Sequence, residues 1–147
     1  MDSFFATLRS THYFIMVALL VFLLFTIGKF YLKKGRGESF GPMENMNTLM
    51  VMIMAHVQLL IGIVLLAFGP MSAHFSNMGE VMKDSSLRMM VVEHPITMIL
   101  GVVMITLGRI KLKKQTECAD KYKTTVIYFA IGLVLFLIRI PWGQLHG

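Results

Sequence analysis

Long apolar stretches alternate with short polar ones along the chain. Four of these stretches are nearly free of charge, and we expect them to span approximately residues 11–31, 46–69, 88–109 and 124–142. A helix needs about 20 apolar residues to cross the hydrocarbon core of a bilayer, and each stretch is close to that length. Because the core holds no water to satisfy an open backbone, the spans must be helical. The pattern therefore predicts four membrane-spanning helices.

The connections between the spans are short, which favours neighbouring helices in antiparallel order. We therefore predict an all-α fold, a single integral membrane domain over residues 1–147 whose four helices run up, down, up and down. In the second connection, Met71, Phe75, Met78 and Met82 recur at spacings of 4, 3 and 4. This spacing predicts one face of a short helix that lies in the outer membrane interface.

Composition and charge narrow the class further. Of the 147 residues 56% are hydrophobic, and the mean hydropathy is +0.69, which is too apolar for a soluble domain of this size. Most of the 14 Lys and Arg residues lie beside the first and third connections: Lys29, Lys33, Lys34, Arg36, Arg109, Lys111, Lys113, Lys114, Lys121 and Lys123. The positive-inside rule places these connections in the cytoplasm and both termini on the outer side of the membrane. The partner we expect is the lipid bilayer, and no nucleic acid.

A few polar side chains interrupt the apolar spans. A polar group in a span is costly, so each is a candidate functional residue. They are His12, His56, Gln58, Glu93, His94, Tyr128, Arg139 and Gln144. In the predicted topology His12, Glu93, His94 and Arg139 share the outer leaflet, within roughly one to two helical turns of one another in depth. His56 lies deeper, near the middle of the second span.

Two stripes of helical spacing join these polar residues to glycines. The stripe in the third span contains His94, Met98, Gly101, Ile105 and Gly108. The stripe in the fourth span contains Tyr128, Gly132, Leu135 and Arg139. Glycine at such positions lets two helices pack closely, which is the interpretation we favour. The other interpretation is that the glycines line the wall of a site for a flat macrocycle.

The histidines in the spans suggest a haem site. Neutral imidazole is the usual axial ligand of b-type haem, and side chains on facing helices can hold haem in a bundle core. The first and third helices of the bundle are diagonal and both begin on the outer side, so His12 and His94 would face each other as iron ligands. Arg139 would then pair with the haem propionates. His56 is the alternative partner of His94, or else serves a second cofactor site or a hydrogen bond in the core.

Glu93 has two candidate partners. One is Arg139, in an ion pair where either charge alone would be stranded, and we favour this interpretation. The other is the head group of a quinol near the outer surface. Pro95 removes one backbone donor and is expected to kink or begin the helix there, which would turn Glu93 and His94 toward the core.

Several segments resemble a known family. "AHVQLLIG", "VEHPITMIL" and "RIPWGQ", with "RSTHYF" at the first histidine, resemble a family of small bacterial four-span membrane proteins described as cytochrome b-like. The resemblance covers nearly the whole chain and implies a haem b protein. More distantly, the arrangement is similar to one half of haem A synthase, and that likeness implies His12 and His94 as the ligands. Here the histidines fall on helices one and three instead of two and four, and this sequence holds one bundle where that enzyme has two.

Two functions of different classes are consistent with these features of the sequence. The first is a membrane-embedded b-type haem protein for electron transfer, with a quinol as its candidate donor. The second is a haem-free accessory or assembly subunit of a respiratory or other membrane complex, in which the histidines form hydrogen bonds between helices. A transporter is disfavoured, because the sequence has no unwound span, acidic ring or inverted repeat. A Soret band distinguishes the first function from the second.

Overall fold

The structure is a computed structural model that describes residues 1–144. These residues form helices and turns and contain no strand. The long helices are α1 (Asp2–Gly35), α2 (Pro42–Phe68), α5 (His94–Lys113) and α6 (Cys118–Ile138). The second connection holds η1 (Pro70–Asn77), α3 (Met78–Lys83), α4 (Ser85–Arg88) and the π-helical turn η2 (Met89–Glu93), and η3 (Trp142–Gln144) follows α6.

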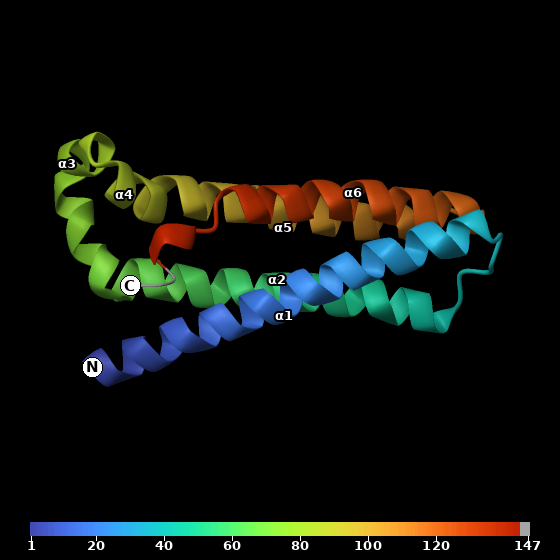
Figure 1. The fold of residues 1–147 in the computed structure, drawn as a ribbon, viewed down its shortest axis with the longest axis horizontal. Coiled ribbons are helices and arrows are strands. Elements are labelled where there is room, and N and C mark those ends of the chain that lie inside the picture. The colour runs from blue at the N-terminus through green and yellow to red at the C-terminus, as the bar shows by residue number, and fades with distance from the viewer. Residues whose placement is uncertain (145–147) are drawn as a thin grey trace.

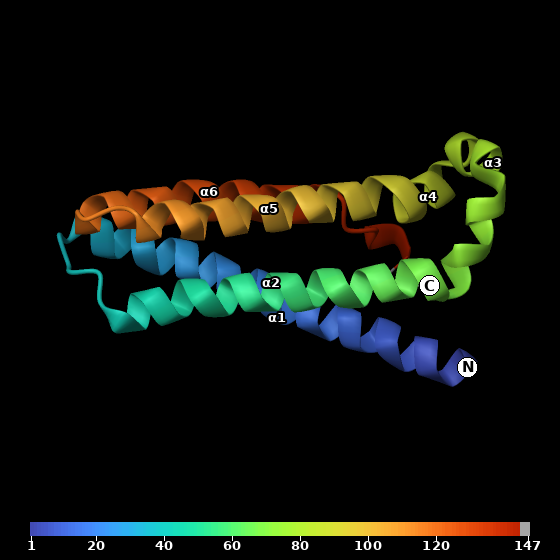
Figure 2. The ribbon, with the colours of Figure 1, turned by 180° about the vertical axis from the view of Figure 1, so that it is seen from behind.

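The long helices form an antiparallel bundle of two layers, α1 with α2 and α5 with α6 (Figure 1). Each layer contacts the other, α1 along α6 and α2 along α5, so α1 and α5 are diagonal across the bundle. The view from behind shows the N-terminus at the same end as α3 and α4, opposite the two short connections (Figure 2). Within residues 1–144, four helical segments are long and apolar enough to cross a membrane. The predicted all-α membrane bundle is confirmed.

The core of the bundle is aliphatic and aromatic. Leu19, Leu23, Val51, Ile105 and Phe129 are buried where the four helices meet. Large apolar side chains also cover the outside of every long helix. Outward apolar side chains are expected where the surrounding solvent is lipid, because hydrocarbon tails are as apolar as the side chains themselves.

The glycines of both predicted stripes lie where α5 packs against α6. A Cβ atom on Gly101 would lie 2.3 Å from a ring carbon of Phe136, and one on Gly108 would lie 2.6 Å from Cβ of Tyr128. A Cβ on Gly132 would lie 3.0 Å from Ile105. The absence of a side chain therefore lets these two helices approach closely, as the favoured interpretation predicted.

The third span contains an α-helix that begins at His94 with Pro95 in its first turn, which is one of the two outcomes predicted for this proline. The helical segment as a whole continues from Ser85 to Lys113 through the π-helical turn, in which the N–H of His94 bonds to the carbonyl oxygen of Met89, five residues back. A proline inside a helix clashes with the carbonyl four residues before it. The wider π turn just before Pro95 relieves that clash without ending the helix, and such turns are frequent at functional sites.

The fourth span ends earlier than expected. α6 stops at Ile138, so Arg139 follows the helix instead of lying in its last turn. Pro141 accounts for this end, since it disfavours helical geometry in the preceding residue and offers no N–H to the carbonyl of Leu137. The indole Nε1 of Trp142 donates to that carbonyl instead, at 3.2 Å.

The second connection is helical but not one continuous helix. A 3-10 segment, η1, is followed by the α-helical α3, and the side chain of Asn77 between them accepts a hydrogen bond from the N–H of Glu80. Because 3-10 and α segments differ in residues per turn, the methionine spacing does not define a single face. Phe75 and Met82 are nevertheless exposed.

We expect Gly108→Ala to destabilise the bundle by about 1–3 kcal/mol, because the new methyl group would overlap the Cβ of Tyr128 and push α5 from α6. Gly28→Ala is the matched control, since a Cβ there meets no atom within 4 Å. The control should be neutral or stabilising by up to about 1 kcal/mol. Thermal unfolding of both variants in detergent measures the difference, and equal melting temperatures would contradict the packing role.

Candidate cofactor site

Two of the predicted ligands meet at the end of the bundle that carries the N-terminus. His12 from α1 and His94 at the start of α5 have ring centroids 6.4 Å apart, with ring planes at 82°. Both side chains are partly buried. The meeting follows from the topology, because α1 and α5 are diagonal and parallel, and residues near the starts of two parallel helices lie at the same depth.

His94 is held by one hydrogen bond. Its Nδ1 lies 2.7 Å from the carbonyl oxygen of Arg139. Because a carbonyl oxygen only accepts, Nδ1 carries the proton, and Nε2 of the neutral ring keeps a free lone pair. Histidines that bind metals are commonly oriented by such a bond from the other ring nitrogen. The carbonyl of Arg139 is available because α6 has ended one residue earlier.

His12 sits against α2. A Cβ atom on Gly62 would lie 3.2 Å from Cε1 of His12, and Gln58 Nε2 donates to the backbone oxygen of His12 at 2.7 Å. Gln58 and Gly62 are four residues apart and thus share one face of α2. Nδ1 of His12 and Oε1 of Gln58 are buried and have no hydrogen-bond partner within residues 1–144. A buried ring nitrogen without a hydrogen-bond partner destabilises the fold unless a further group, such as a ligand, binds it.

A charged group lies beside the histidines. Glu93 pairs with Arg139, with Nε and Oε2 3.4 Å apart, so the predicted ion pair is present. Arg88 makes a second, closer pair at 3.0 Å, which the sequence interpretation missed. Residues five apart do not face each other on a regular α-helix. The π-helical turn between them brings Arg88 and Glu93 to one side.

The structure does not bring His56 to this site. Its side chain is exposed on α2, and its Nδ1 contacts the carbonyl oxygen of Met52 in the preceding turn, at 2.8 Å. Tyr128 packs against Gly108 and lies under the ammonium group of Lys111. Gln144 is exposed in η3. These polar residues of the spans are therefore separate from the histidine pair.

The ligand set of the pair fits a haem better than a bare metal ion. Within residues 1–144 no group of three or more His, Cys, Asp and Glu side chains could hold a metal ion. A structural zinc site uses four protein ligands and a catalytic one uses three. A haem iron takes four nitrogens from the porphyrin and needs only the axial ligands from the protein.

A second polar cluster, at the opposite end of the bundle, was not predicted. Lys33 of α1 pairs with the buried Glu44 of α2, and also with Glu38 at 3.3 Å. Glu44 also accepts a hydrogen bond from the N–H of Gly41 at 2.9 Å, and this bond caps the N-terminus of α2. The signal in the sequence was the glutamate that follows "GP" at a helix start, because a glutamate at the third helical position can bond back to the cap.

Lys33→Met should destabilise the fold, because it leaves the buried Glu44 carboxylate without its cation. Lys29→Met, one turn earlier and outside the ion pairs of residues 1–144, should cost less than about 1 kcal/mol. Unfolding in detergent with added denaturant compares the two variants. The double substitution Lys33→Met/Glu44→Gln should recover part of the loss, and a double variant as unstable as Lys33→Met would contradict the charge explanation.

Comparisons with models of protein families, with curated proteins and with solved structures give no match for this chain. The class of protein is therefore defined by its own fold and site. It is an all-α membrane bundle of four spans in which two diagonal helices bring a pair of histidines together.

Proposed function

We propose that the protein is a membrane-embedded b-type cytochrome that transfers electrons, with His12 and His94 as the axial ligands of one haem b. The observation that carries this proposal is the histidine pair itself: the two rings come from diagonal helices with centroids 6.4 Å apart, and residues 1–144 hold no group of three His, Cys, Asp or Glu side chains that could bind a metal ion. When bound, the haem supplies reversible one-electron transfer. We further propose a bacterial inner membrane as the location, with both termini on the periplasmic side.

The residues around the pair have defined roles in this proposal. The carbonyl of Arg139 orients the ring of His94 and fixes its tautomer, which leaves Nε2 for the iron. Gly62 leaves room for the ring of His12 beside α2. Arg139 is half-exposed and shares Glu93 with Arg88, so the guanidinium groups of this site carry one positive charge more than Glu93 neutralises. An excess of this sign suits the anionic propionates of haem.

A quinol is the donor we would test first, since the proposed site lies within the membrane-spanning bundle. Glu93 is poorly placed to bind a quinol head group, because an arginine contacts each of its two carboxylate oxygens. We therefore assign Glu93 to holding Arg88 and Arg139 in place. The quinol role of Glu93 carries less support than this structural one.

The alternative, a haem-free accessory subunit, explains less of the site. It requires His12 and His94 to act as hydrogen-bonding residues between helices. His94 meets that requirement through the carbonyl of Arg139. His12 does not, because its buried Nδ1 has no partner within residues 1–144. A haem-binding role gives the two rings a shared partner.

The test is haem content after expression with ample haem supply. The wild-type protein purified in detergent should show a sharp b-type α band in its reduced-minus-oxidised spectrum and about one haem per chain by pyridine haemochrome assay. His12→Ala and His94→Ala should each keep less than about a tenth of that haem. His56→Ala is the matched control and should keep nearly all of it, because His56 is exposed and outside the pair.

Two results would overturn the proposal. A wild-type protein without haem would leave the accessory-subunit function, and the search would turn to co-purifying membrane partners. Loss of haem in His56→Ala together with its retention in His12→Ala would replace the ligand pair by His56 and His94.

A further inference from the structure

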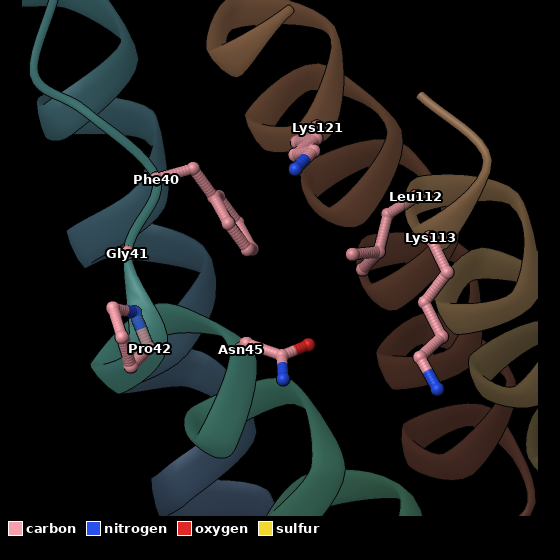
Figure 3. A pocket seen from close by; sticks show the side chains of 7 residues that line it. All are labelled: Phe40, Gly41, Pro42, Asn45, Leu112, Lys113 and Lys121. Carbon is pink, nitrogen blue, oxygen red and sulfur yellow. The ribbon is translucent and has the colours of Figure 1, made fainter. Parts of the chain in front are cut away.

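A cavity of about 360 Å³ lies at the end of the bundle opposite the histidines, between the start of α2 and the connection from α5 to α6. Figure 3 shows the ring of Phe40 pointing into it, with Asn45 below and Lys121 above. Apolar side chains of Phe40, Pro42 and Leu112 form part of its lining, and Lys113 and Lys121 supply positive charge. None of these residues belongs to the proposed haem site.

The positive charge of this cavity is not neutralised. The ion pairs formed within residues 1–144 include neither Lys113 nor Lys121. The ammonium group of Lys121 lies 5.5 Å from the centroid of the Phe40 ring, which keeps the charge at the aromatic wall. The nearest buried carboxylate on α2, that of Glu44, is already engaged by Lys33 and by the N–H of Gly41.

A third cation, the guanidinium group of Arg109, lies behind the side of the cavity that Asn45 lines. Arg109 of α5 is only 4% exposed and makes no ion pair within residues 1–144. Its NH1 donates to the carbonyl oxygen of Asn45 at 3.0 Å and to the hydroxyl of Thr48 at 2.5 Å. Asn45 itself lines the cavity, so the guanidinium charge sits directly behind that residue. A buried cation held only by neutral oxygens favours an anion nearby.

We propose that this cavity binds the phosphate of an anionic phospholipid headgroup. The proposal does not rest on haem binding. Basic pockets between membrane helices at the level of the head groups are suited to such lipids. The cavity lies where α2 and α6 begin and α5 ends, and its apolar side chains offer a surface for the first part of an acyl chain. A zwitterionic head group suits it less, because its cation would meet the same lysines.

The experiment is native mass spectrometry of the full chain in detergent, titrated with phosphatidylglycerol or phosphatidylcholine. The wild-type protein should bind phosphatidylglycerol at least about tenfold more tightly. Lys113→Gln/Lys121→Gln should weaken phosphatidylglycerol binding about 30-fold, or about fivefold for each lysine. The control, Lys114→Gln/Lys123→Gln, removes the same charge from two exposed lysines outside the cavity and should change binding less than about threefold.

Four outcomes would overturn the proposal, the last of them for the case in which the double variant does not fold. An equal loss in both double variants would show a diffuse attraction to the basic connections. Equal affinity for the two lipids would exclude recognition of the anionic head group. Displacement of phosphatidylglycerol by millimolar inorganic phosphate would indicate a site for a soluble anion. If Lys113→Gln/Lys121→Gln does not fold, the two single variants decide, and a loss of less than about twofold in each would reject the site.

Discussion

The pairing of backbone groups inside a bilayer is the constraint on which this structure depends. Lipid offers no hydrogen bonds, so each span must be helical over its length, and a departure from regular helix needs a local substitute. Two such departures occur at the histidine end: the π-helical turn before His94 and the end of α6 at Ile138. Each has its substitute, the bond from the N–H of His94 to Met89 in one case and the indole N–H of Trp142 in the other.

Two prolines produce these departures and thereby build the site. Pro95 follows the π turn that brings Arg88 and Glu93 to one side of the helix. Pro141 ends α6 and frees the carbonyl of Arg139, which then fixes the ring of His94. The orientation of a candidate ligand on the third span thus depends on where the fourth span stops. If α6 continued for another turn, the carbonyl of Arg139 would accept a bond within that helix instead.

The periodicity of the sequence predicts the contacts that regular helices bring about. It does not predict the contacts that depend on an irregular turn or on the end of a helix. Four spans in alternating direction suffice to bring His12 and His94 to the same depth, and the depth of Arg139 suffices to predict its pair with Glu93. The second pair, with Arg88, depends on a π turn, which an α-helical spacing cannot represent. The buried Arg109 counted as one more charge of a basic connection, because hydropathy does not reveal that neighbouring helices cover a residue near a helix end.

Charge is distributed differently at the two ends of the bundle, and this distribution supports the two proposals separately. Beside the histidines, Arg88 and Arg139 share the single carboxylate of Glu93, so one positive charge is left where haem propionates would lie. At the other end, Lys33 pairs with Glu44, whereas the partners of Arg109 within residues 1–144 are all neutral oxygens. Of these cations, Arg109 is the one whose burial costs desolvation, and a bundle that served packing alone would gain nothing from it. The two proposed ligands, a haem carboxylate at one end and a lipid phosphate at the other, would give these charges a physical reason.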